Sequence, residues 1–436
     1  MLTAFARAFK TPDLRKKLLF TGFIMAIFRL GSFIPAPGIS YVEVQKCRAP
    51  GGQGNQLLGL VNLFSGGGLL QLSVFALGIM PYITASIIIQ LLTVVIPRFE
   101  TLKQEGQAGQ AKLTQYSRYL TIGLAVLQSS TYITFARNPS QLFNNPACTS
   151  IMTDDGFATA AMIVLTMTAG TGLIMWLGEL ITARGIGNGM SLLIFTSIAA
   201  GFPASLWGIQ QSQGWATFIG VIVLGFGIIA AVVFVEQCQR RIPVQYAKRM
   251  IGRRMYGGTS TYIPLKVNQA NVIPVIFASS LLALPGLIVQ FQNSNPDPPG
   301  WVGWLQANMV RGDHPYYMIT YAALIIFFTF FYVSITFNPT EVADNMKKYG
   351  GFIPGIRAGR PTAEYLNYVL TRITVPGALY LTAVSLIPLV ALVMIGADQN
   401  FPFGGTSILI VVGVGLETVK QIESQLQQRH YEGFLR

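Results

Sequence analysis

The sequence predicts an all-α polytopic membrane protein. Of its 436 residues, 52% are hydrophobic and 11% are charged, whereas soluble globular proteins carry about 25% charged residues. Long apolar segments follow one another along the chain, and a bilayer core is crossed by about 20 apolar helical residues. Ten crossings fit best, at 18–39, 69–96, 119–135, 157–181, 190–209, 215–235, 268–289, 316–337, 374–396 and 404–419.

The first apolar segment follows the basic run Arg15-Lys16-Lys17, as the apolar part of a secretory signal peptide does. Arg29 interrupts this segment, which also lacks a clear small-x-small cleavage site. We therefore expect a retained membrane helix. Because Arg29 is the only charge well inside a span, we expect its side chain to bond backbone carbonyls or a facing polar group.

The second crossing belongs to an uncharged stretch of 49 residues, 49–97, which is too long for one crossing and too short for two with a turn. A short apolar piece at 57–65 precedes the glycine triplet 66–68, and one full span follows at 69–96. Each glycine costs roughly 1 kcal/mol inside a helix, so the triplet marks a turn. Non-helical backbone at membrane depth survives only where it is buried in protein or lines a water-filled cavity. We therefore expect this half-helix and its hinge to line or block a passage.

The basic residues predict the orientation, because cytoplasmic loops carry an excess of Lys and Arg. If the N-terminus is cytoplasmic, 23 of the 30 Lys and Arg residues fall in inside segments and 4 fall in outside loops. The remaining three, Arg29, Arg118 and Arg372, lie within or at the ends of spans. The sequence therefore predicts that both termini are cytoplasmic.

Two inside loops are longer than a turn requires, at about 237–266 and 338–364. The first has seven basic residues and no acidic one, and its apolar and polar residues alternate on both sides of glycines. This pattern predicts a protruding hairpin. Charge that only sets the topology could by itself explain both loops, whereas their length and patterning favour docking sites for an acidic partner, either protein or RNA.

Few residues are candidates for catalysis, metal binding or proton transfer. The cysteines have unrelated spacings that predict no metal or disulfide framework, although spacing does not decide whether Cys47 and Cys148 are paired. With two histidines in the chain, a zinc or haem site is not expected. The acidic residues Glu179, Glu236 and Glu417 lie near the cytoplasmic ends of spans, so the chain lacks the acidic proton relay of a pump.

Apolar residues at helical spacing remain as candidates. Ile79 and Ile83 share a face of the second span, and Met190 and Ile194 share a face of the fifth. By spacing alone, such residues face lipid or the core of the helix bundle. Only a family match could assign them to the lining of a pore.

Nine short motifs, in order along nearly the whole chain, are FRLGSFIP at 28–35, NLFSGG at 62–67, FALGIMPYI at 75–83, GIGNG at 185–189, QRRIP at 239–243, PLKVN at 264–268, FNPTEVADN at 337–345, PGIR at 354–357 and FGGTS at 403–407. With them the chain resembles the SecY family, the central subunit of protein-conducting channels. The resemblance implies ten transmembrane helices in two inverted five-helix halves, 1–209 and 210–436, around a central hourglass pore with a plug half-helix. It also implies a channel that conducts unfolded secretory polypeptides across the bacterial cytoplasmic membrane and releases transmembrane segments laterally into it.

The resemblance implies a role in the pore for two groups of residues. The half-helix at about 58–68 would be a plug that seals the outer funnel, and it includes Asn62, Leu63, Phe64, Ser65, Gly66, Gly67 and Gly68. A ring of apolar side chains would close the pore, with methionine in place of an expected isoleucine at one position; its members would be Ile79, Ile83, Met190, Ile194, Ile276 and Ile410.

Two further groups are implied outside the pore. Gln90 and Asn268 would lie at a lateral gate, between the second and third spans on one side and the seventh and eighth on the other. Basic residues of the two long inside loops would dock cytoplasmic partners, with Arg357 as the central one among Arg240, Arg241, Arg253, Arg254 and Arg357.

The implied partners are the small membrane subunits SecE and SecG, the motor ATPase SecA, the ribosome, signal peptides and nascent chains, and membrane lipids. The chain would not be an enzyme, and it would need no cofactor, metal or catalytic residue, because a cytoplasmic ATPase or a translating ribosome would supply the energy. The alternative is an inverted-repeat secondary transporter, which predicts midplane charges or a polar substrate pocket. A membrane-embedded enzyme predicts paired catalytic groups within the bilayer. The sequence offers apolar faces instead of either.

Overall fold

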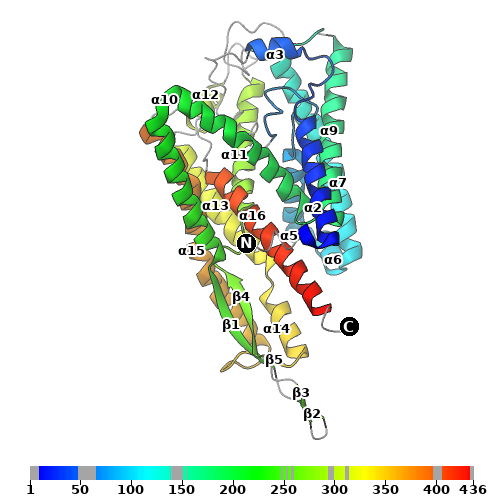
Figure 1. Cartoon of the computed structure of the whole chain (residues 1–436), viewed down its shortest axis with the longest axis vertical. Helices are drawn as coiled ribbons and strands as arrows, with labels where there is room; N and C mark the ends of the chain where they lie inside the picture. Colours follow the sequence, from blue (N-terminus) through cyan, green and yellow to red (C-terminus); the bar gives the residue numbers. More distant parts are fainter. Residues whose placement is uncertain are drawn as a thin grey trace.

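The computed structural model describes residues 9–47, 65–137, 139, 151–154, 156–246, 249–251, 254–256, 260–292, 299–309, 314–395 and 405–432. Long helices form a bundle, and a small group of strands projects from one end of it (Figure 1). The short helices α3 (Tyr41–Cys47) and α12 (Gly300–Asn308) lie at the opposite end. The described chain is thus mostly helical, with its strands at one end.

Every predicted span overlaps a helix. The fifth and sixth spans share α10, but Gly214 has non-helical φ and ψ angles of 83° and −179°, which confirms a break between them. The long helices are α2 (Pro12–Gly31), α5 (Met80–Val95), α7 (Gln107–Arg137), α9 (Phe157–Arg184), α10 (Gly189–Gln237), α11 (Ile273–Gln292), α13 (Pro315–Thr336), α15 (Arg360–Ile395) and α16 (Gly405–Glu432).

Several of these helices could cross a membrane by their length and composition alone. Among the described residues, four helices pass both criteria, or five if α5 and the following α6 (Pro97–Gln104), which are bent by 100°, count as one span. The presence of several such helices is consistent with a multi-pass membrane protein. The count of ten crossings stays a prediction.

The second span differs from its prediction. The sequence predicts one helix over 69–96, but α5 begins at Met80 and the preceding segment runs as turns. This segment satisfies its backbone outside a helix: Val74 N donates to Ile34 O at 2.9 Å, and Leu72 O accepts from Ala36 N at 3.0 Å. Leu72 has a φ of 46°, a left-handed value that a right-handed helix does not accommodate. The prediction was wrong because hydropathy cannot distinguish a buried turn segment from a helix.

The main hydrophobic core lies between α2, α5, α9, α10, α11, α13, α15 and α16. The 69–79 segment is held against α2 by the ring of Phe75, which stacks on Phe28 with ring centroids 5.9 Å apart. Gly31 permits this approach, because a Cβ at that position would lie 2.1 Å from the Phe75 ring. The non-helical segment is therefore buried in protein, as backbone at membrane depth requires.

Cys47 ends α3 and is disulfide-bonded, whereas Cys238 is a free thiol. The expectation that the cysteines form no disulfide framework is therefore wrong for Cys47. The remaining cysteine, Cys148, lies outside the described residues. Spacing along the chain gives no sign of this bond because distant segments meet here: Ser40 N donates to the carbonyl of Ile151 at 2.9 Å.

The first long loop forms the expected hairpin. Strand β1 (Gln239–Tyr246) pairs antiparallel with β4 (Ser260–Lys266), and β2 (Arg249–Ile251) pairs with β3 (Arg254–Tyr256) at the tip (Figure 1). The second long loop contains α14 (Pro339–Lys348) and β5 (Gly351–Phe352), and β5 pairs with β1. Both loops share one apolar core, to which Ile242, Leu265, Met346 and Ile353 contribute. We call β1, β4, β5 and α14 the strand unit; the sequence did not predict that the two loops form one body.

Candidate functional site

The six residues of the expected ring belong to one apolar cluster; five come from α5, α10, α11 and α16, and Ile79 directly precedes α5. Ile79 and Ile410 are each 1% exposed, and Ile194 is 4% exposed. The other three pack against the same cluster and are partly buried: Ile83, Met190 and Ile276. The structure thus brings together residues that are up to 331 positions apart in the sequence.

Most of these residues lie near the starts of their helices. Ile79 precedes α5, and its carbonyl accepts a hydrogen bond from Ile83 N at 3.1 Å. At the start of α10, Asn188 Oδ1 caps the helix by accepting from Met190 N at 3.1 Å. The Met190 thioether packs against α9, since a Cβ on Gly178 would lie 2.5 Å from its Sδ. A flexible, unbranched side chain at position 190 therefore fills the space that Gly178 leaves.

The expected plug is described only at its C-terminal end, residues 65–68; outside the described residues are Asn62, Leu63 and Phe64. The predicted glycine turn is confirmed, with φ of +67° at Gly66, a value that favours glycine. Ser65 is fully buried, and its Oγ accepts a hydrogen bond from Leu69 N at 3.0 Å. These contacts tie the glycine turn to the buried 69–79 segment.

Arg29 is bound to this glycine turn. Its Nη1 donates a hydrogen bond to the carbonyl of Gly66, and its Cζ lies 4.6 Å from the centroid of the Phe33 ring. The expectation that Arg29 bonds a backbone carbonyl is therefore confirmed. Hydrogen bonds that involve a charged group contribute about 1.5–3 kcal/mol, so this contact stabilises the position of the turn. The sequence did not predict which carbonyl receives the guanidinium.

The structure places the two expected gate residues in different surroundings. Gln90 is exposed on α5. Asn268 is 2% exposed, and its Nδ2 donates to Glu236 Oε1 at 2.5 Å and to Asn271 O at 3.1 Å. Glu236 ends α10 and is itself 6% exposed. Asn268 therefore uses its amide donor within the C-terminal half, where it serves a buried carboxylate.

Removing this amide donor is expected to destabilise the fold. Asn268→Leu leaves the Glu236 carboxylate buried without a donor, which costs about 1–3 kcal/mol, so the midpoint of thermal unfolding in detergent should fall. Gln90→Leu is the matched control, because its side chain is exposed, and it should unfold with the intact chain. If Asn268→Leu also unfolds at the temperature of the intact chain, the amide does not support the carboxylate.

Two helices meet along the seam where a lateral gate is expected. Helices α5 and α11 pack against each other. Near the strand end, Lys103 Nζ on α6 donates to the carbonyl of Ile335 on α13 at 3.3 Å. A cation at the C-terminal end of a helix is favoured by the helix dipole. Sequence reasoning missed Lys103, because nothing in the local pattern indicates a contact 232 residues away.

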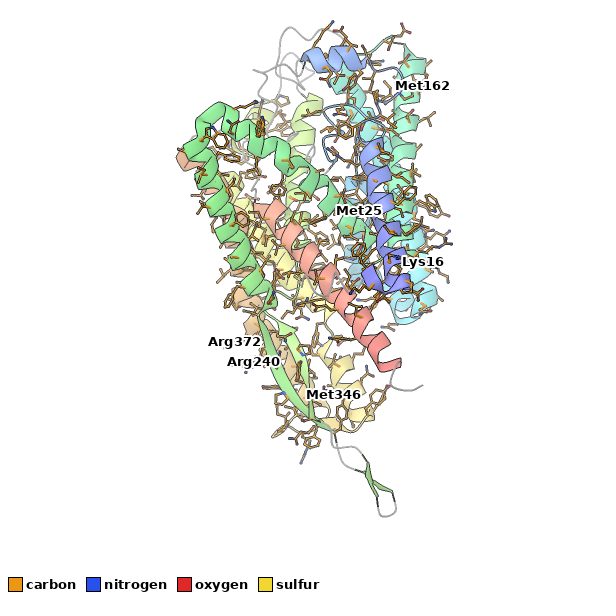
Figure 2. All side chains as sticks on the ribbon, in the orientation of Figure 1. Lys16, Met25, Met162, Arg240, Met346 and Arg372 are labelled. Carbon is orange, nitrogen blue, oxygen red and sulfur yellow. The ribbon has the colours of Figure 1, made fainter. Side chains whose placement is uncertain are left out.

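Three of the expected docking residues, Arg240, Arg241 and Arg357, lie on the strand unit or next to it. Figure 2 places Arg240, together with Met346 and Arg372, toward this end of the molecule. Arg240 and Arg241 are exposed on β1, and the Arg241 guanidinium lies 4.7 Å from the centroid of the Tyr262 ring. Arg357 is exposed in the turn that follows β5. Of the other two expected docking residues, Arg253 and the side chain of Arg254 lie outside the described part of the chain.

One pair of opposite charges joins two of the spans. Arg118 on α7 donates two hydrogen bonds to Glu179 on α9, each at 2.8 Å. Within the described residues, no group of three or more His, Cys, Asp or Glu side chains could hold a metal ion.

Comparisons with known proteins identify the family and the fold. A family model described as SecY matches residues 73–419. A protein translocase subunit SecY from Streptomyces griseus is 67% identical over 441 residues, which cover 100% of both chains. A solved structure of a translocation channel, whose SecY plug domain is described as stabilising the closed state, has a TM-score of 0.62 at 18% identity and covers 94% of this chain and 91% of that one. Sec61 in a canine ribosome–channel complex has a TM-score of 0.60 at 17% identity, with the same coverage.

Proposed function

Because the chain belongs to the SecY family, we propose that it is the pore-forming subunit of a protein translocase. In this role it conducts unfolded secretory polypeptides across the cytoplasmic membrane and releases transmembrane segments laterally into the lipid. The observation that carries the proposal is that the six proposed ring residues, from α10, α11, α16 and the start of α5, belong to one apolar cluster, while Gly66 of the glycine turn lies against Ser197 on α10.

A ring of apolar side chains suits a pore that carries many different chains. The proposed ring consists of Ile79, Ile83, Met190, Ile194, Ile276 and Ile410. Such side chains grip a moving polypeptide by contact alone, without recognising its sequence. A hydrophobic constriction also resists wetting, so ions pass slowly when no polypeptide fills it.

The other site residues have roles consistent with their positions. Residues 62–68 form the plug, and the turn at 66–68 is its hinge. The lateral gate opens along the seam between α5 and α11, near Gln90 and the contact of Lys103 with α13. Asn268 serves this gate indirectly, by fixing the start of α11 to the end of α10 through Glu236.

We further propose ten crossings in two inverted halves, 1–209 and 210–436, with both termini in the cytoplasm of a bacterium. The strand unit then faces the cytoplasm, and α3 faces the outside. The disulfide at Cys47 and the free thiol of Cys238 support this orientation, because disulfides persist in oxidising compartments and are rare in the cytosol.

The proposed partners follow from this orientation. SecA or a translating ribosome docks on the basic strand unit through Arg240, Arg241, Arg253, Arg254 and Arg357, and SecE and SecG bind within the membrane. Signal peptides and nascent chains enter the pore, and lipid receives the released helices. Either docked partner supplies the energy, so the chain itself needs no catalytic residue.

Transport of a polypeptide tests the proposal. The chain, reconstituted with its membrane subunits in vesicles, is expected to import an unfolded secretory polypeptide when the motor ATPase and ATP are added, and protection from added protease measures the import. A secondary transporter would instead take up a small solute and leave the polypeptide outside. Two charges within the described spans are already engaged and do not favour that alternative, since Arg29 is bound to a carbonyl and Arg118 is paired with Glu179.

A further inference from the structure

The contact between Arg29 and Gly66 joins a helix to the end of the proposed plug. Arg29 belongs to α2, and Gly66 lies 37 residues later in a non-helical turn. The guanidinium is received by a backbone carbonyl, so the bond needs no acceptor side chain in the plug. A cation at membrane depth is costly unless it finds such a partner, and this cost favours the bonded position of the turn.

Gly66 fits into a socket between α2 and α10 because it has no side chain. A Cβ on Gly66 would lie 3.1 Å from Arg29 Nη1 and 3.4 Å from the Cα of Ser197. Its φ of +67° also lies in the left-handed region that favours glycine. A Cβ on Gly67, whose φ is +89°, would meet nothing within 4 Å. The socket is therefore specific to position 66.

Ser197 connects the socket to the ring. It lies three residues after Ile194 on α10, so the two side chains share a face of the helix. Ser197 is 2% exposed, and its Oγ donates to the carbonyl of Leu193 at 3.1 Å, which holds it to the helix. An outward movement of this part of α10 therefore carries Ser197 away from Gly66 together with Ile194.

We infer that Arg29 is a positioning residue that holds Gly66, and with it the plug, in the resting channel, and that displacement of α10 at Ile194 releases it. The inference rests on the proposed function. A polypeptide that widens the ring moves Ile194 and Ser197 outward, the socket opens on the α10 side, and the Gly66 carbonyl can leave the guanidinium. After Gly66 is released, the Arg29 guanidinium keeps its contact with the Phe33 ring, because both residues belong to the same stretch of chain.

Ion leak through the resting complex tests this role. Arg29→Gln is expected to raise the resting conductance of the reconstituted complex by about 10- to 100-fold, the factor by which one charge-assisted hydrogen bond biases an equilibrium. Arg29→Lys keeps a cationic donor and should restore most of the seal. Arg118→Gln is the control for loss of an arginine in a span, since Arg118 pairs with Glu179 far along the chain from the plug, and it should leak as the intact chain does.

A pair of glycine variants tests the socket without changing the charge. Gly66→Ala places a methyl group against Arg29 Nη1 and Ser197, whereas Gly67→Ala adds the same methyl group into open space at a similarly positive φ. Gly66→Ala should leak more than Gly67→Ala by about tenfold. Amide hydrogen exchange over 66–73 should become faster in Arg29→Gln and Gly66→Ala, while exchange in β1 and β4 stays unchanged.

The outcomes separate this inference from the proposed function. If the intact complex imports polypeptide but Arg29→Gln and Gly66→Ala seal as well as it does, the holding role of Arg29 is overturned. The proposed channel function is then unaffected. If Arg29→Gln does not insert into the membrane, Gly66→Ala and Gly67→Ala test the inference instead. Equal leaks in these two variants overturn it. An intact complex that neither conducts ions nor imports polypeptide overturns both.

Discussion

A chain that lacks residues 62–68 is expected to leak ions at rest, by at least about tenfold relative to the intact chain. The deletion removes the glycine turn and the Gly66 carbonyl that Arg29 holds, so the proposed plug loses its attachment to α2. The apolar ring alone then has to exclude water and ions. Single-channel conductance in a planar bilayer, or dye efflux from vesicles, measures the leak.

The polypeptide in transit provides the internal control for this deletion. A translocating chain fills the ring, so the deleted and intact complexes should conduct ions equally while import is stalled. Ile410→Asn in the deleted chain should raise the leak further, because a polar side chain at a position that is 1% exposed favours wetting of the ring. Unchanged resting conductance together with intact uptake of a small solute would contradict the channel.

Reversal of charge at Arg357 is expected to reduce ATP-driven import by at least about tenfold while the protein stays folded and inserted. The Arg357 side chain is exposed. The turn that carries it is shaped by backbone, with φ of 84° at Gly355 and 107° at Gly359. Thr362 Oγ1 also donates to the Arg357 carbonyl at 2.9 Å. None of these contacts uses the guanidinium, so Arg357→Glu should leave the turn intact and place a negative charge where the proposed acidic partner docks.

A neighbouring arginine supplies the matched control. The Arg360 side chain is 89% exposed and pairs with Glu364 at 3.0 Å. Arg360→Glu makes the same change of charge three residues away, and it should lower import much less than Arg357→Glu. Import is measured by protease protection, and insertion by the amount of full-length chain in the membrane. Equal losses in both variants would mean that net charge, and not Arg357, carries the docking.

Helix positions were predictable where the length of an apolar segment and the charged residues around it indicate the same boundaries. The span predicted at 157–181 coincides with α9 (Phe157–Arg184), and the break between the fifth and sixth spans falls at Gly214. The hairpin was predictable because apolar and polar residues alternate on both sides of glycines, and strands follow a period of two. These features depend on local patterns, and local patterns are what one sequence records directly.

The remaining features depend on contacts between segments far apart in the chain. The 69–79 segment is as apolar as a span, and only its hydrogen bonds to residues 34–36 explain why it is not a helix. The gate role of Asn268 stays a prediction, and the local sequence gives no sign that its amide donates to Glu236, 32 residues earlier. The ring residues could be named from the family resemblance, whereas their spacing alone was equally consistent with a bundle core.

The pairing of β5 with β1 joins the two long loops into one mechanical unit. Strand β1 follows the last residues of α10, β4 leads into α11 past the Asn268–Glu236 bond, and β5 leads into α15. Every connection of this unit therefore runs to the C-terminal half. If the proposed motor docks on this unit, its force reaches α10, α11, α13 and α15 directly, because these are the helices to which the unit is joined along the chain.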